Sequence, residues 1–192
     1  MFKRILWLIS LIFFSSFGHL LADTGIKLLL HSVRQVGHGV GVAGWFIRPN
    51  VADNSNKWLI TIGPAKKIGH WSLEVMIGSF VQNKKATPLF DVRFECDQFA
   101  PIRFWSNLEW VNPARGGEDE ALVYIEGKYW VVPKVFALGV ESENLFFDGK
   151  DDIASFGGQI TFVFGIMSFT GAHQIHLFDG PKERIRVVLN LP

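Results

Sequence analysis

The chain has 192 residues, of which 48% are hydrophobic, 14% aromatic and 19% charged, a length that suits one domain rather than two large ones. Its 19 basic and 18 acidic residues give a net charge of +1, so no global charge favours nucleic acid or an anionic membrane surface as a partner. The single cysteine, Cys96, excludes an intrachain disulfide, and the chain has no CxxC or Cys/His zinc motif.

The first 22 residues have the pattern of a secretory signal peptide. Lys3 and Arg4 precede an apolar run at 5–14, and a short polar break leads to Leu20-Leu21-Ala22. A membrane anchor helix is the alternative, but the apolar run is short for a span of about 20 residues. We therefore expect export, cleavage after Ala22 and a single mature domain at 23–192. The absence of a cysteine at that point excludes lipoprotein anchoring.

The first half of the mature chain reads as strands. Residues 24–48 are irregular, with glycines interrupting the second apolar part, and predict one long bent strand or two short ones, counted here as one. Residues 57–63 and 70–82 alternate between apolar and polar positions, which predicts a hairpin with a turn at 64–69.

Residues 87–97 and 101–111 predict a second hairpin, in which the apolar faces and the charged faces of the two strands coincide. Folding it about 97–101 places Glu95 directly opposite Arg103 and Phe94 opposite Phe104, so charges and apolar faces agree in one register.

The second half continues the alternation, with a turn expected at 127–131 and a two-residue turn at Gly165-Ile166. All eight prolines fall at strand boundaries or at the chain end in this scheme. An even number of strands would place both ends of the barrel chain on one side. Ten segments result: 24–48, 57–63, 70–82, 87–97, 101–111, 119–126, 131–144, 153–164, 167–178 and 184–191.

Strand length separates two interpretations of this pattern. A soluble sandwich or lipocalin-like barrel would also alternate, but soluble strands average about five or six residues, whereas a tilted membrane-crossing strand needs about nine to eleven. Aromatic residues also stand near strand ends, where membrane girdles form. The fold class predicted is therefore all-β, an antiparallel transmembrane barrel of about ten strands, within a range of eight to twelve. The predicted aromatic girdle is Trp58, Trp71, Trp110, Trp130 and Phe178.

Together these features resemble the small outer-membrane β-barrels of Gram-negative bacteria. The signal peptide, the antiparallel alternation, the short turns and the last strand, Arg184-Ile-Arg-Val-Val-Leu-Asn-Leu191, carry the resemblance, although such barrels usually end in an aromatic residue and this chain ends in Leu191-Pro192. The resemblance implies a porin-like membrane barrel in the outer membrane, with outer-membrane lipid as its surroundings. A periplasmic location is the alternative, and no protein partner is indicated.

Enzyme signatures are absent from the sequence. There is no glycine-rich phosphate loop, HExxH motif or GxSxG elbow, so no catalytic residue, metal or cofactor is predicted. His31 and Ser32 are adjacent and point to opposite faces of a strand, which is poor geometry for a base and its nucleophile. His173 lies on the apolar face, where packing is the simpler role. An enzyme that modifies outer-membrane lipid and a soluble periplasmic binding protein remain as alternative functions.

The polar faces of the strands predict a charged lumen. Charges turned into a narrow barrel must pair to offset their desolvation, so we expect a structural network that fills much of the cross-section. Seven acids exceed four arginines by three, which favours cations in any residual path. The predicted lumen network is Glu74, Asp91, Arg93, Glu95, Arg103, Glu109, Glu126, Glu141, Glu143, His176, Arg184 and Arg186. The expected function is structural, or limited permeation.

Overall fold

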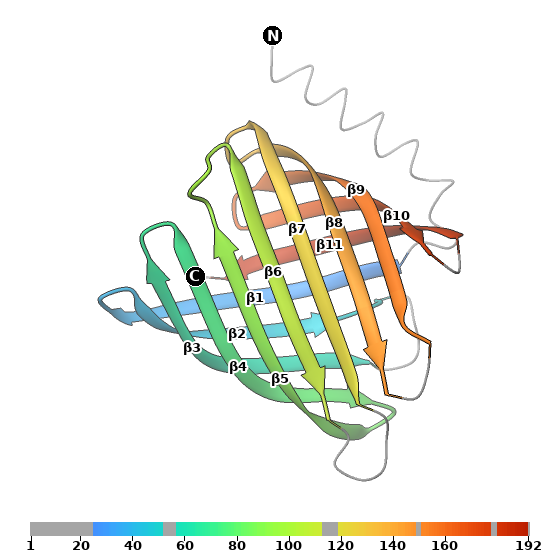
Figure 1. The fold of residues 1–192 in the computed structure, drawn as a ribbon. Helices are drawn as coiled ribbons and strands as arrows, with labels where there is room; N and C mark the ends of the chain where they lie inside the picture. The colour runs from blue at the N-terminus through green and yellow to red at the C-terminus, as the bar shows by residue number, and fades with distance from the viewer. Residues whose placement is uncertain (1–24, 52–56, 113–118, 149–150, 178–179, 192) are drawn as a thin grey trace.

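The computed structural model describes residues 25–51, 57–112, 119–148, 151–177 and 180–191, which form one closed β-barrel (Figure 1). The predicted signal peptide and Phe178 lie outside the described residues. The strands are β1 (Gly25–Gly37), β2 (Val40–Arg48), β3 (Trp58–Ile68), β4 (Trp71–Gln82), β5 (Lys85–Cys96), β6 (Ile102–Val111), β7 (Glu120–Val132), β8 (Phe136–Phe147), β9 (Ile153–Phe164), β10 (Met167–His176) and β11 (Gly180–Leu191).

The barrel has eleven strands rather than about ten. Residues 24–48, counted as one segment in the prediction, form the second alternative, two strands, β1 and β2, joined by His38 and Gly39, which both have positive φ. Positive φ at both positions is what a tight hairpin turn requires, and the glycine-rich composition hid this turn from the alternation pattern. The two-residue turn at Gly165-Ile166 is confirmed.

An odd strand number makes the closure parallel. All consecutive strands pair antiparallel, and β1 pairs parallel with β11 from Gly25↔Arg184 to Ser32↔Leu191. In Figure 1 these two strands lie side by side. The closure leaves no unpaired sheet edge. The start of β1 and the end of β11 therefore lie at opposite ends of the barrel, and the expectation that both lie on one side was wrong.

The two barrel ends differ. At the turn end, the connections are residues 38–39, 69–70, 97–101, 133–135 and 165–166. The loop end is the opposite end, where the strand ends Gly25, Arg48, Trp58, Gln82, Lys85, Val111, Glu120, Phe147, Ile153, His176 and Gly180 lie. These two names are used below.

Two strands are longer than the sequence predicts. Pro64, expected in a turn, lies inside β3, where pairing with β4 stops after Ile62↔Ile77 and resumes at Ala65↔Glu74. A proline has no backbone N–H to donate, so the backbone pairing with β4 is interrupted beside it, but the strand continues. Gly127, also expected in a turn, lies inside β7 opposite Phe104, with the aromatic ring beside it.

The register of the β5–β6 hairpin differs by two residues from the prediction. The structure pairs Glu95 with Trp105 and Phe94 with Ser106, so neither Arg103 nor Phe104 stands opposite its predicted partner. A shift of two residues keeps every side chain on its face, and the facing pattern alone therefore could not exclude it.

The barrel interior has an apolar part and a charged part. A cluster of buried apolar side chains extends over β1–β5: Leu29, Ala43, Trp45, Ile47, Leu59, Ala65, Met76 and Leu89. Charged and polar side chains fill the interior faces from β4 around to β11. Large apolar side chains alternate with these on the outward face, as in β3, where Ile60 and Ile62 are 48% and 61% exposed.

Candidate functional site: the charged barrel interior

The predicted lumen residues lie on the strand faces turned to the interior. Eight of the twelve are buried: Glu74, Asp91, Arg93, Glu109, Glu126, Glu141, Glu143 and His176. The other four, Glu95, Arg103, Arg184 and Arg186, are half-buried and ion-paired.

Arg93 is the centre of the first cluster. Its guanidinium donates to Asp91, with Nη2 at 2.9 Å from Oδ2, and to Glu109 Oε1 at 3.2 Å. Thr61 also donates to Asp91, at 3.0 Å. The guanidinium carbon lies 3.9 Å from the ring centroid of Trp45, close enough for a cation–π contact. One buried cation thus pairs with two buried acids and joins the charged network to the apolar cluster.

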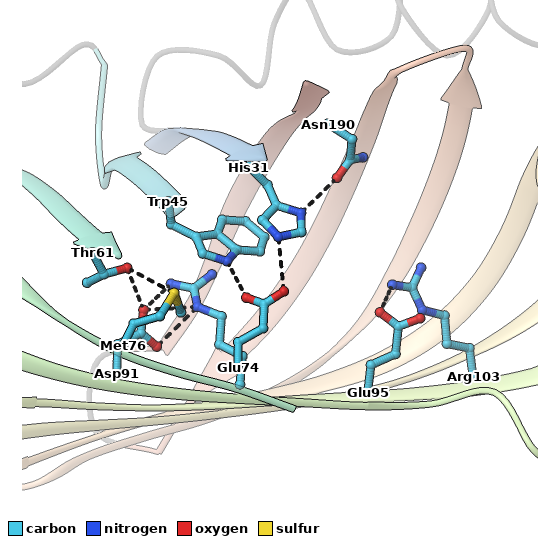
Figure 2. Close-up of polar contacts among 10 residues, drawn as sticks. His31, Trp45, Thr61, Glu74, Met76, Asp91, Glu95, Arg103 and Asn190 are labelled. Atoms are coloured by element: carbon cyan, nitrogen blue, oxygen red, sulfur yellow. Dashed lines mark hydrogen bonds and ion pairs between the residues drawn. The ribbon is translucent and has the colours of Figure 1, made fainter. Parts of the chain in front are cut away.

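Glu74 forms a second cluster with β1 and β2. Figure 2 shows its carboxylate between two partners: Trp45 Nε1 donates at 2.7 Å, and His31 Nε2 lies 3.0 Å away. The other ring nitrogen of His31 lies 3.3 Å from Asn190 Oδ1, and the imidazole stacks on the Trp45 indole with centroids 4.0 Å apart. Because β2 and β3 separate β1 from β4 in the sheet, the contact between His31 and Glu74 bridges the interior.

The third cluster lies around Tyr124. Its hydroxyl is 2.8 Å from carboxylate oxygens of both Glu126 and Glu141. Arg186 of β11 ion-pairs with Glu141 of β8 and stacks on the Tyr124 ring, 4.6 Å from its centroid. Gln174 donates to Glu141 at 2.5 Å. Arg186 and Gln174 reach Glu141 from strands that are not neighbours of β8 in the sheet.

Three further ion pairs lie around these clusters. Arg184 pairs with Glu143 at 2.5 Å and Lys128 with Glu126 at 2.7 Å. Arg103 pairs with Glu95 at 2.5 Å although they are not directly opposite, because the arginine side chain is long enough to reach the diagonal position. Figure 2 shows this pair apart from the Glu74 and Arg93 clusters.

Two of the cavities among the described residues lie toward opposite ends of the barrel interior. The turn-end cavity, of about 200 Å³, is lined by His31, Glu74, Arg93, Trp105, Lys128 and Arg186, among others. The loop-end cavity, of about 250 Å³, is lined mainly by apolar residues with Lys27, Lys57, Glu109, Glu120 and Glu143. The two cavities share no lining residue. Between them lie fully buried side chains, namely Arg93, Met76, Gln174, Glu141 and Asp91. Among the described residues, these side chains separate the two cavities.

Several interior residues were missed from the sequence. Lys128 was missed because Gly127 was taken as the end of a strand, and His31 and Lys27 because their segment showed no clear alternation. The sequence predicts three more acids than arginines in the interior. Three lysines that also line the cavities, Lys27, Lys57 and Lys128, offset this excess, and Glu120 adds one further acid. The net charge of these interior residues is therefore close to zero. Four uncharged side chains also bind interior carboxylates: Trp45, Tyr124, Gln159 and Gln174. No sequence motif marks them as members of the network.

The predicted girdle residues do not all lie on the outward face. Trp71 and Trp110 are exposed, and Trp58 stacks on outward-facing Phe46. Trp130 pairs with fully buried Ala137, and directly paired residues share a face, so Trp130 belongs to the interior face near the turn end. Its assignment to the girdle was wrong. A turn was expected at 127–131, so the alternation of inward and outward side chains was not followed through β7 as far as Trp130.

The described residues offer little for catalysis. His31 points into the interior, and adjacent Ser32 lies on the opposite face, beside an apolar groove of the outer surface. His173 is exposed on the outward face. Within the described ranges, no group of three or more His, Cys, Asp or Glu side chains is placed to hold a metal ion. The same part of the chain has no helix that is long and apolar enough to cross a membrane.

Comparison with known proteins bears on the fold. No protein-family model and no curated protein sequence matches the chain. The structure is similar to that of a porin refined at 1.8 Å resolution, with a TM-score of 0.51 and 9% identity over 78% of this chain. The chain spans about 56% of the length of that porin. At this identity the similarity concerns architecture alone: the chain has a porin-like closed β-barrel fold.

Proposed function

We propose that this protein is an outer-membrane β-barrel of a Gram-negative bacterium, exported by a signal peptide at residues 1–22, with a structural or limited-permeation role. The observation that supports this most is the distribution of polarity. Carboxylates and guanidinium groups are buried inside, whereas twelve large apolar side chains on the strands are exposed outside. They are Ile60, Ile62, Ile77, Phe90, Leu108, Trp110, Ile125, Leu138, Val140, Phe156, Phe164 and Ile175. A soluble monomer rarely exposes so continuous an apolar surface, because contact with water is unfavourable.

The strand lengths support the same proposal. The strands run from 9 residues in β2 to 13 in β1 and β7. A tilted strand of about nine to eleven residues crosses the hydrocarbon core of a bilayer. Closure through the parallel β1–β11 pair supplies backbone partners all around the barrel, as a lipid environment demands.

The proposed role follows from how the interior is filled. Ions and solutes need a continuous polar path, and the Arg93 and Tyr124 clusters occupy the middle of the interior, between the two cavities. The network therefore acts as a plug that braces the barrel, and permeation is limited to what passes between these side chains.

Cell fractionation tests the location. We expect the protein in the outer-membrane fraction, released only by detergent, with a mature N-terminus at Asp23. Recovery from the periplasm without detergent would contradict the membrane proposal and favour a soluble binding protein. Substituting His31 or His173 by Ala should leave the lipid A profile unchanged, and an altered profile would instead support a lipid-modifying enzyme.

A further inference from the structure

The loop-end cavity combines apolar walls with charges at its rim. It measures about 250 Å³ and opens toward the loop end. Its apolar walls are Ile47, Pro49, Leu59, Phe80, Val111, Leu122 and Leu145.

These walls come from two facing groups of strands. Ile47 of β2 pairs directly with Leu59 of β3, which in turn pairs with Phe80 of β4. Leu122 of β7 pairs with Leu145 of β8 and forms part of the opposite wall. Water in such a space gains few hydrogen bonds from the walls, so an apolar group that fills it is favoured.

The acids at this cavity already have partners. Glu109 accepts from Arg93 at 3.2 Å and from Asn107 at 2.7 Å. Glu143 is ion-paired with Arg184 at 2.5 Å. Glu120 also has an interaction partner. The carboxylates are thus committed to the protein's own groups rather than open to a cationic ligand.

The lysines at the rim differ in this respect. Among the described residues, no ion pair within 4.0 Å involves Lys27 or Lys57. Of the two, Lys27 is near enough to Glu143 for a longer-range electrostatic attraction. Lys57 is therefore the cation of this cavity that an anionic group can reach without displacing a described carboxylate.

The register places both lysines on one side of the mouth. Leu29 pairs with Ile47, and Ile47 pairs with Leu59, in a row across β1, β2 and β3. Moving two residues toward the loop end along each strand gives Lys27, Pro49 and Lys57. The rim above the β2–β4 wall is thus cationic, directly beside the apolar surface.

We propose that the loop-end cavity binds an amphiphile that has a short apolar group and an anionic head. The apolar group lies between the β2–β4 wall and the β7–β8 wall, and a carboxylate head pairs with Lys57 at the rim. Ligand pockets usually measure about 300–1,000 Å³, so this smaller space suits a short alkyl chain or one ring rather than a whole lipid. The inference rests on the barrel interior and holds whichever membrane contains the barrel.

Photolabelling in an uncharged bilayer tests this site. The full-length protein is placed in phosphatidylcholine nanodiscs and irradiated with octanoic acid that carries a diazirine at its chain end. We expect labelled peptides to contain Leu59, Phe80 or Leu122. Unlabelled octanoate should compete with the probe, and octylamine should not.

Matched variants separate this site from general lipid contact. Lys57→Glu should lower the labelling about tenfold and Lys57→Arg should retain it, because a charge-assisted contact is lost only in the first. Lys66→Glu, near the turn end, is the charge control. Leu122→Trp fills the cavity and should abolish labelling, whereas Ile125→Trp, on the outward face of the same strand, should not.

The labelling results distinguish binding in the loop-end cavity from general contact with lipid. Each variant is first checked for folding by its far-UV circular dichroism and its heat-dependent gel mobility. Labelling that maps to outward residues and persists in folded Lys57→Glu and Leu122→Trp proteins would overturn the proposal. Equal competition by octylamine would also overturn it, because the head would then not be recognised as an anion.

Discussion

Arg93 of β5 stacks its guanidinium on the indole of Trp45 of β2, 3.9 Å from the ring centroid, although β3 and β4 separate the two strands in the sheet. The same guanidinium pairs with Asp91 and Glu109, so one side chain links both sides of the interior. Its exposed fraction is only 2%. Around Arg93 the interior is therefore filled by packed side chains.

Removing Arg93 should destabilise the barrel strongly. Arg93→Ala leaves Asp91 and Glu109 buried without their cation, a change that typically costs about 3–5 kcal/mol. Arg103→Ala is the matched control: the Arg103–Glu95 pair is about one-third exposed, and such pairs contribute about 0–1 kcal/mol. Denaturant unfolding followed by tryptophan fluorescence measures both. Equal losses in the two variants would contradict the central role of Arg93.

Two adjacent glycines of β9 should respond differently to alanine. A Cβ at Gly157 would collide with the backbone carbonyl oxygen of His173, whereas a Cβ at Gly158 meets no atom within 4 Å. Gly157→Ala should therefore lower the free energy of unfolding by about 1–3 kcal/mol, as overpacking does. Gly158→Ala should stay within about 0.5 kcal/mol of the wild type. If both variants unfolded alike, the close approach of β9 and β10 would be in error.

The native cysteine can test the register of the β5–β6 hairpin. Cys96 pairs directly with Phe104, and directly opposed residues lie close enough for a disulfide. Phe104→Cys should therefore oxidise readily with Cys96, and a count of free thiols by maleimide labelling should fall to zero. Ile102→Cys, which would oppose Cys96 if the register were shifted by two, should keep both thiols free. The reverse result would restore the register in which Glu95 faces Arg103.

Charge on the outward face tests the membrane environment. Ile62, in the middle of β3, and Ile68, at its end, are similarly exposed at 61% and 65%. In a bilayer, Ile62→Arg should cost about 2–4 kcal/mol and Ile68→Arg about 0–1 kcal/mol, because the cost depends on depth. Refolding into lipid vesicles at several urea concentrations gives these values. Two near-neutral substitutions would indicate a surface that faces water.

The sequence predicted a closed β-barrel fold, and for β5, β6 and β8 it predicted which side chains face inward, because side chains alternate with a period of two. The inward parity of Asp91, Glu109 and Glu141 follows directly from that rule. What the rule cannot supply is register, since the β5–β6 hairpin shifts by two residues without moving any side chain to the other face.

Turns and distant contacts explain the remaining differences. Gly127 and Pro64 look like strand ends, but tertiary pairing carries both strands through them, and Lys128 was lost from the predicted network as a result. The contacts of His31 with Glu74 and of Arg186 with Glu141 join strands that are far apart in the sheet. They depend on how side chains from different strands meet in the barrel interior, which no local sequence pattern reports.

The conductance of the purified wild-type protein in planar bilayers tests the closed interior most directly. Insertion is verified beforehand by the protection of the barrel from added protease. With the Arg93 and Tyr124 clusters between the two cavities, we predict little or no current in the wild type and a raised leak in folded Arg93→Ala protein. Large, stable channels formed by the wild type would contradict the account, because they would require a continuous aqueous path where these side chains lie.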